Sequence, residues 1–383
     1  MPAHPLQRHR AVHAVARSRG LANLRALCQL GLAPELLVPA LLEALHEVVP
    51  SSRNLFDWTD ANGELLRYFV EGPVDEEVAR HYFEEFHNRR EAEAMPLFRA
   101  LRHAPAGVRS ARELDHAWFF ASALYNEIWR PQRLHWRVEA VLRGASGTLL
   151  GSLVLYRAPG ERCFSADEER LLASLLPMMA AALERGAQAP APTRFVERPG
   201  SEQSLLLTAD GRISHASPGA RQLLMLARGG ISRQALDAPL DELAGQALPV
   251  LQHALRRQPG GHPVLTHENA WGRFTLRAQA LAGAAPATLT LVTLHWSEPH
   301  ALAMERALNA LPVTPGQRSV CRRLLQGQTQ SHIASQLGVS LATVVDHVRK
   351  IYLTLDLRSA QELQARVDAE MRAAAPPWQR VDS

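Results

Sequence analysis

Hydrophobic residues in the first half of the chain follow two spacings, one typical of helices and one typical of strands. Apolar residues recur every three to four positions, as on one helix face, in residues 21–50, 75–94 and 164–186. Apolar and aromatic runs bounded by turn residues predict strands at 53–58, 64–72, 135–144 and 147–158. Asn62-Gly63 favours a tight hairpin turn between the first two runs. This order of elements predicts an α+β domain over residues 20–187.

A second block follows a segment rich in proline and alanine at 187–194. Asp210-Gly211 predicts a turn between two short strands, and Ser217-Pro218 predicts the N-cap and first residue of a helix. Near the end of the block, two antiparallel strands are predicted at 272–281 and 287–296. Residues 200–297 are therefore predicted to form a second, smaller α+β domain, and no internal repeat is visible in the sequence.

A short helical segment connects the second block to the last one. Its apolar residues at helical spacing are Leu302, Met304, Leu308 and Leu311. Residues 298–312 are therefore predicted to be a linker helix. Two interpretations remain open: a helix that carries a signal or a dimer contact, and a simple connector.

The last block, residues 313–371, contains four readable helix starts. Their N-cap residues are Thr314, Thr329, Ser340 and Ser359. The first is followed by Pro315 and Gln317 and the fourth by Glu362, which completes two capping boxes. Gly338-Val339 forms a tight turn between the second and third helices. Two helices joined by a short turn with glycine are a helix-turn-helix, so an all-α four-helix domain is predicted.

This block resembles the DNA-binding domain of the LuxR/FixJ class of bacterial regulators. The residues that carry the resemblance are Thr314-Pro315, Val320, Leu324, Gly327, Ile333-Ala334, Leu337-Gly338-Val339-Ser340, Thr343-Val344, His347-Val348 and Ile351. The sequence departs from the family pattern at Gln317, His332 and Thr354, where the family usually has charged residues. These changes weaken phosphate contacts and local salt bridges but leave the helix pattern intact.

The two earlier blocks resemble sensor domains. The first ends in a strand, a loop and a long helix, as a GAF domain does, and the second opens with a strand, a turn and a helix, as a PAS domain does. In the second block Ser217-Pro218 stands where that family usually has Asn-Pro. The predicted fold is thus multidomain: an α+β GAF-like domain, an α+β PAS-like domain and the four-helix C-terminal domain.

The helix-turn-helix predicts which residues contact DNA. A recognition helix places its N-terminal half against base edges while flanking groups hold phosphates. The candidate contact residues are Thr329, Ser340, Thr343, Val344, Val345, Asp346, His347, Arg349 and Lys350. Val344 also suits the core by its spacing. Asp346 is an acid in the middle of this helix, and it can accept a hydrogen bond from cytosine while repelling phosphates.

Charge and composition limit the function classes. Between residues 313 and 357, five basic residues (Arg318, Arg322, Arg323, Arg349, Lys350) face two acids, Asp346 and Asp356. The chain has 42 basic residues and Lys350 is its only lysine, which excludes a Walker A phosphate loop and disfavours an attached receiver domain. No transmembrane run, secretory signal, disulfide framework, metal-binding constellation or catalytic motif is apparent, so we expect a cytoplasmic protein that is not an enzyme and holds no cofactor or metal.

The resemblance implies a regulator that binds double-stranded DNA as a homodimer, with Ser359 to Val367 supplying a dimer face. Several aromatic residues of the first block are more typical of core or dimer contacts but leave open a pocket for a small-molecule ligand: Phe56, Trp58, Tyr68, Trp118, Trp129 and Trp136. One alternative is a signalling adaptor or enzyme whose C-terminal block binds protein rather than DNA. Another is a DNA-binding protein without a ligand, in which the sensor folds serve only to dimerise.

Overall fold

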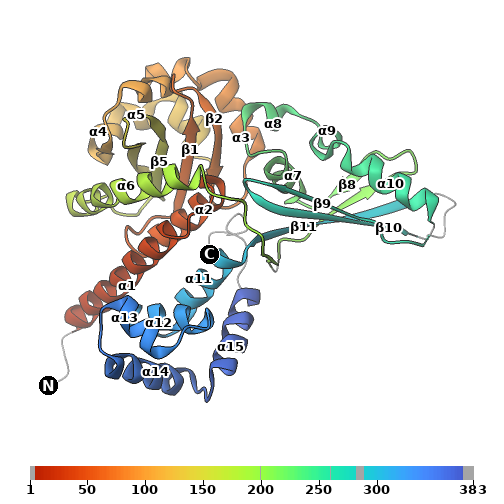
Figure 1. Ribbon diagram of the computed structural model, residues 1–383. Coiled ribbons are helices and arrows are strands. Elements are labelled where there is room, and N and C mark those ends of the chain that lie inside the picture. The colour runs from red at the N-terminus through yellow and green to blue at the C-terminus, as the bar shows by residue number, and fades with distance from the viewer. Residues whose placement is uncertain (1–4, 199, 259, 282–288, 374–383) are drawn as a thin grey trace.

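The computed structural model describes residues 5–198, 200–258, 260–281 and 289–373. The chain is a multidomain protein with two N-terminal α+β domains, each built on an antiparallel sheet, and a C-terminal bundle of helices (Figure 1). The predicted fold class is confirmed at this level.

The first domain is built on a five-stranded sheet in the order β2-β1-β5-β4-β3. The strands are β1 (Arg53–Thr59), β2 (Leu65–Val70), β3 (Gly107–Arg109), β4 (Trp136–Arg143) and β5 (Leu149–Arg157). Three helices pack against one another: α1 (Pro5–Cys28), α2 (Pro34–Leu45) and α6 (Ala166–Gly186). Of these, α2 and α6 lie against one face of the sheet. At the start of α6, Ser165 and Glu168 form the predicted capping box, which satisfies backbone N–H groups that have no helical partner.

The opposite face of this sheet is covered by short helical segments. They are α3 (Glu76–His81), η1 (Tyr82–Phe86), η2 (Arg90–Glu93), η3 (Phe98–His103), α4 (Ala111–Leu114), α5 (Ala117–Ala121) and η4 (Tyr125–Trp129). The continuous helix predicted over 75–94 is therefore wrong. The buried carboxylate of Glu91 accepts hydrogen bonds from the Tyr82 hydroxyl and from the backbone N–H groups of Asn88 and Phe98, and these bonds fold the chain back on itself.

The second domain has strands β6 (Phe195–Glu197), β7 (Gln203–Leu207), β8 (Ile213–Ala216), β9 (Val264–Asn269), β10 (Gly272–Leu281) and β11 (Leu289–Pro299). Their order is β8-β7-β11-β10-β9, with β6 pairing beside β11. Apart from β6, this is the strand order of the first sheet, although the sequence shows no repeat. The helices are α7 (Ala220–Ala227), α8 (Arg233–Asp237), α9 (Leu240–Ala244) and α10 (Ala247–Arg257).

The helix start predicted at Ser217-Pro218 is wrong by two residues. The helix α7 begins at Ala220, with Gly219 in the N-cap position. The Ser217 hydroxyl instead accepts a hydrogen bond from the Ser204 backbone N–H and donates one to the side chain of Gln203. Ser217 thus joins the β7–β8 strand pair and is not free to cap the helix.

The two α+β domains share a continuous hydrophobic core. Trp271 of the second domain packs against Trp58 and Phe69 of the first, with ring centroids 5.5 and 6.0 Å away. The Tyr68 backbone N–H also donates to the Ile231 carbonyl at 2.9 Å, so the second domain pairs with the edge strand β2. A displacement of β2 would therefore act directly on the second domain through this hydrogen bond.

The central strand β5 tolerates only glycine at position 151. Gly151 has a φ of +149°, and a Cβ there would overlap the Asp57 carbonyl oxygen. We expect Gly151→Ala to lower the free energy of unfolding of the first domain by about 3 kcal/mol, from overpacking and backbone strain together. Urea titration followed by tryptophan fluorescence measures this change. Gly147→Ala is the control, because a Cβ at that position would meet no atom within 4 Å, and an equal loss in both variants would contradict the steric argument.

Candidate functional site

The C-terminal bundle contains a complete helix-turn-helix, formed by α13 (Gln330–Leu337) and α14 (Leu341–Leu355). Thr329 caps α13 by accepting from the His332 N–H, and Ser340 caps α14 by accepting from the Thr343 N–H. Gly338 takes the left-handed conformation, with φ +64°, that glycine adopts without a steric penalty. Gly338 at the end of α13 and Ser340 at the start of α14 therefore bound the turn, as predicted from the sequence.

Three further helices surround this motif: α11 (His300–Ala310), α12 (Pro315–Leu325) and α15 (Ala360–Ala373). Thr314 and Gln317 form the predicted capping box at α12. At α15, Ser359 caps as predicted, but Glu362 accepts from the Arg358 N–H. The apolar side of α15 packs on α11 of the same chain. The dimer face predicted for Ser359 to Val367 therefore has its apolar residues, Leu363 and Val367, buried within the bundle.

Val344 lies on the inner side of α14, and the structure removes it from the candidate contacts. It is fully buried with Val320, Ile333 and Ile351 in the core of the bundle. A base edge cannot reach its methyl groups, so the prediction that Val344 contacts DNA is wrong. The spacing that suited the core was the correct interpretation.

The outer face of α14 carries an apolar and basic surface. Leu341, Val345 and Leu353 are 47%, 48% and 71% exposed, and Arg349 and Lys350 also face solvent. The candidate Val345 is therefore available to DNA, and its methyl groups can meet a thymine methyl group. Leu341 is three residues before the core residue Val344, so its spacing did not predict exposure. Leu353 lies outside the core spacing, and that position was the available signal.

Asp346 is paired with the only lysine of the chain. Its carboxylate lies 2.7 Å from Lys350 Nζ, one helical turn away. The hydrogen bond from Lys350 lowers the pKa of Asp346 below its usual value, so the carboxylate is ionised at neutral pH. In the free protein Asp346 thus neutralises one of the two cations on this face.

The remaining candidates occupy different positions around the motif. Thr329, Ser340 and Thr343 are exposed at the helix starts, where backbone N–H groups and hydroxyls can bind a phosphate. His347 is half-buried with its ring over Gly316, and its Nδ1 has no hydrogen-bond partner among the described residues. A side chain held in this way can reach DNA only through its other nitrogen.

Two of the five basic residues counted in the sequence do not face solvent. Arg318 is buried and donates to the Asn309 side chain at 2.5 Å, while Arg322 forms two hydrogen bonds with the buried Glu305. Both therefore tie α12 to α11, and the charge available to phosphates is smaller than the sequence suggested. Arg358, just past the segment that was counted, is exposed and adds one cation.

The linker helix α11 joins the bundle to both earlier domains. It follows β11 directly, and its residues Ala303, Ala307 and Leu308 belong to the core of the bundle. On its other side, Arg306 lies 3.6 Å from Glu43, and Asn309 donates to Glu47 at 3.4 Å. Figure 1 shows α11 where β11 meets the C-terminal helices. The helix α11 is thus held on both sides by the parts of the chain that it connects.

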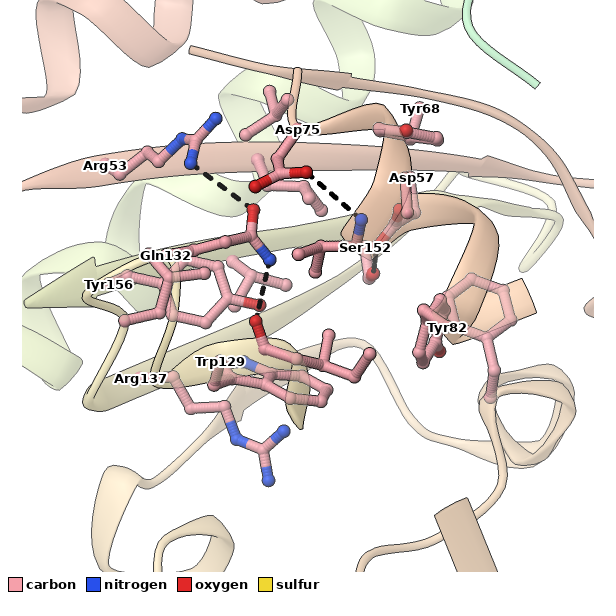
Figure 2. Close-up of a pocket in the computed structure, with 18 of the residues that line it drawn as sticks. Arg53, Asp57, Tyr68, Asp75, Tyr82, Trp129, Gln132, Arg137, Ser152 and Tyr156 are labelled. Atoms are coloured by element: carbon pink, nitrogen blue, oxygen red, sulfur yellow. Dashed lines mark hydrogen bonds between the residues drawn. The ribbon is translucent and has the colours of Figure 1, made fainter. Parts of the chain in front are cut away.

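A cavity of about 150 Å³ lies in the first domain, between the sheet and the short helices that cover it (Figure 2). The cavity has an aromatic lining from the short helices and the sheet: Tyr82 and Phe83 of η1, Phe98 of η3, Trp129 of η4, and Tyr68 and Tyr156 of the sheet. Polar groups meet it at Arg53, Asp57, Asp75, Gln132, Arg137, Glu139 and Ser152. An apolar cavity with a few polar groups is typical of a small-molecule site.

The six aromatic residues considered from the sequence divide into two groups. Tyr68 and Trp129 line the cavity. The others do not: Phe56 and Trp58 lie in the core on the other face of the sheet, Trp118 is exposed, and Trp136 donates to the Glu161 carbonyl at 3.0 Å.

The described residues include neither a membrane-spanning helix nor a cluster of metal-ligating side chains. Along the stretches of chain that the structure covers, no helix is long and apolar enough to cross a membrane. The same stretches bring together no group of three or more histidine, cysteine, aspartate or glutamate side chains able to hold a metal ion.

Residues 312–366 match the family model described as bacterial regulatory proteins, luxR family. The C-terminal domain is therefore a LuxR-family helix-turn-helix domain, and the resemblance carried by its framework residues is confirmed. No curated protein matches the chain.

Among solved structures, a phage VqmA–DPO complex is 23% identical, with 46% of this chain and 86% of that chain covered and a TM-score of 0.19. A VqmA–ligand–DNA complex from Vibrio cholerae is 13% identical, with 47% and 87% covered and a TM-score of 0.22. The Escherichia coli DhaR(N)–DhaL complex is 15% identical, with 74% and 90% covered and a TM-score of 0.21. Similarity at these TM-scores does not establish a common fold.

Proposed function

We propose that this protein is a transcriptional regulator in which the outer face of α14 reads the major groove of double-stranded DNA. The observation that carries the proposal is a fully capped helix-turn-helix, matched by the luxR family model, whose second helix leaves Val345, Arg349 and Lys350 exposed. Thr329, Ser340 and Thr343 hold phosphates at the helix starts, and Asp346 and His347 complete the contact set. Val344 is left out because it is buried.

The two α+β domains act as GAF-like and PAS-like sensors, and the cavity of the first holds a small-molecule signal. Support for this role comes from the position of the cavity: Tyr68 lines it and also pairs with the second domain, and Arg221 of α7 lies 2.7 Å from Glu76 of the covering helix α3. A ligand that favours one arrangement of these contacts shifts the population through β11 and α11. In a homodimer this changes the spacing of two recognition helices relative to half-sites about one DNA turn apart.

Selection from genomic DNA tests the regulator directly. Purified protein is incubated with sheared genomic DNA, bound fragments are sequenced, and the selection is repeated across salt concentrations. Enrichment of a sequence with two-fold symmetry, lost at high salt, is the expected result. If the full chain shows no enrichment, residues 298–383 are tested alone. Absence of salt-dependent binding by that fragment as well contradicts the proposal.

A protein-binding role for the bundle is the second candidate, and one observation favours it. Val339, Leu341, Val345 and Leu353 are all large, apolar and exposed on or beside α14, and exposed apolar patches are typical of protein contacts. This role predicts binding that changes little with salt, whereas DNA binding weakens steeply as salt rises.

The charge of Asp346 gives a prediction for DNA discrimination. We expect Asp346→Asn to raise affinity for non-specific DNA by roughly 3- to 10-fold at low salt, because Lys350 is released and one phosphate-repelling charge is lost. Discrimination at the base pair that Asp346 faces should relax. Fluorescence anisotropy with specific and random duplexes measures both effects. Asp356→Asn is the matched control, with the same charge change at the far end of α14, and equal effects of the two variants would rule out a local role for Asp346.

A further inference from the structure

The floor of the cavity contains a row of polar side chains on three adjacent strands. Asp57 of β1 lies directly opposite Tyr68 of β2 and Ser152 of β5. Residues opposite each other in antiparallel strands point to the same face, so the three side chains meet at one end of the cavity. Figure 2 shows Asp57 and Ser152 facing each other there, with Arg53 and Gln132 toward the other side.

Asp57 has no cationic partner among the described residues. Its one hydrogen bond comes from the Ser152 hydroxyl at 3.1 Å. The two cations of the cavity wall are engaged elsewhere: Arg137 lies 3.0 Å from Asp115, and Arg53 donates to the Glu71 and Pro73 carbonyls at 2.7 Å. Glu139, also in the wall, pairs with Arg109 at 3.1 Å. A buried carboxyl group without a countercharge is costly in its ionised form, so its place in a cavity calls for an explanation.

The Tyr68 hydroxyl beside Asp57 is also unsatisfied. It is buried and has no hydrogen-bond partner among the described residues. Buried polar atoms in folded proteins nearly always have a partner, and an exception at a cavity wall is where a ligand supplies one. Tyr68 lines the cavity and lies opposite Asp57, so its hydroxyl is a second unfilled hydrogen-bonding group at this end of the cavity.

The walls add a preference for positive charge. The faces and edges of Tyr68, Tyr82, Phe83, Trp129 and Tyr156 surround the cavity, and aromatic faces attract organic cations. An engineered apolar cavity of about 150 Å³ holds benzene, so this cavity admits a molecule of little more than one six-membered ring.

We propose that the cavity binds a small organic ammonium ion, a primary amine with one ring or an aliphatic group of similar size, whose N–H groups donate to Asp57 and to the Tyr68 oxygen. The inference rests on the proposed role of this cavity as the ligand site of the sensor and names the chemical class of that ligand. The aromatic walls enclose the apolar body, and the ammonium supplies the countercharge that Asp57 lacks.

Binding of an ammonium ion is expected to release one proton from Asp57. Burial raises the pKa of Asp57 to about 8, with the Ser152 hydrogen bond lowering it and Glu139 raising it. The charged groups that line the same cavity are Arg53, Arg137, Glu139 and Asp75. Arg137 pairs with Asp115, Glu139 with Arg109, and Arg53 with backbone carbonyls, while Asp75 caps α3. The hydroxyls of Tyr68, Tyr82 and Tyr156 also lie there, and burial raises their pKa values, so they stay protonated. At pH 7 the empty cavity thus holds a neutral carboxyl, and an ammonium that binds the carboxylate displaces one proton into solvent. Affinity should rise up to about tenfold per pH unit below pH 8 and then level off.

Calorimetry of the full chain with benzylamine tests the proposal, with benzyl alcohol as the neutral isostere. We expect benzylamine to bind at least about tenfold more tightly, to release close to one proton when buffers of different ionisation enthalpy are compared, and to gain affinity between pH 6 and 8. Asp57→Asn should lower its affinity at least about tenfold while leaving benzyl alcohol unchanged. Asp167→Asn is the matched control, because Asp167 lies in the first turn of α6 in the same domain, is 84% exposed and does not line the cavity.

The possible results distinguish a failure of the ammonium proposal from a failure of the proposed ligand-binding and DNA-binding functions. Equal binding of the alcohol, or an Asp57→Asn variant that binds benzylamine normally, overturns the ammonium proposal but leaves the cavity as a ligand site. If neither probe, nor cyclohexylamine as the aliphatic amine, binds, the ammonium proposal also fails. DNA binding by α14 is measured independently of all three probes. Asp57→Asn removes an unpaired buried acid, so it should fold normally, which its melting temperature checks.

Discussion

Changing Val345 and Arg349 together to glutamate is expected to reduce affinity for a selected operator by at least about 100-fold at physiological salt. Loss of one good base contact costs about 1–3 kcal/mol, and two added carboxylates repel the phosphates that line the groove. Both side chains are exposed on the outer face of α14, so the bundle should fold unchanged. Fluorescence anisotropy measures the affinity, and far-UV circular dichroism and the melting temperature report the fold.

The chain offers a closely matched control for this pair. Val250 and Arg257 are also exposed on one helix, α10, and Val250 is 50% exposed against 48% for Val345. Glutamate at both positions causes the same change in net charge far along the chain from α14. A similar loss in the control would mean that net charge governs binding, and no loss in the α14 variant would show that DNA lies against another surface.

The sequence predicted the helix-turn-helix well because its signals are local. Capping side chains act within one turn of the helix they begin, so Thr314, Thr329 and Ser340 could be placed without knowledge of the fold. The hairpin at Asn62-Gly63 and the strands β4, β5 and β10 followed from local patterns in the same way. The prediction of one continuous helix over 75–94 was wrong because Glu91 forms hydrogen bonds that the spacing of apolar residues does not indicate.

The cavity could not be predicted, because its groups are brought together by strand register. Asp57 and Tyr68 lie on the two strands of the predicted hairpin, but their register was not predicted. Ser152 is distant in the sequence and becomes their neighbour only through the pairing of β1 and β5. The same limit applied to charge. Arg318 and Arg322 were counted in the basic charge of residues 313–357, and only the structure shows that their partners lie on α11. The position of Val344 in the recognition helix predicted a DNA contact, whereas its apolar spacing predicted a core residue. Its burial in the structure decides for the core.

Arg306→Ala is expected to weaken the attachment of the C-terminal bundle to the first domain. Its side chain forms a hydrogen bond with the buried Glu298 and lies 3.6 Å from Glu43 of α2. In the variant, Arg198 would still lie 3.8 Å from Glu298. Glu298 and Glu43, which are largely buried, would however lose the positive charge of Arg306. Removing one partner of a buried ion pair costs about 3–5 kcal/mol, so this is the largest single-residue effect on stability that we expect.

Hydrogen exchange is the suitable measurement, because a multidomain chain does not unfold in one step. Exchange in α11 and at the end of α2 should accelerate in Arg306→Ala, while β4 and β5 keep their protection. The exposed pair of Arg277 and Glu197, 3.3 Å apart, supplies the control, since Arg277→Ala should cost less than about 1 kcal/mol. A double-mutant cycle with Glu43→Ala isolates the interdomain contact, and a coupling near zero would show that the bundle is held to the first domain by apolar packing alone.

Arg306→Ala should also reduce the effect of any cavity ligand on DNA affinity, because α11 would no longer be held between the sensor and the recognition helix.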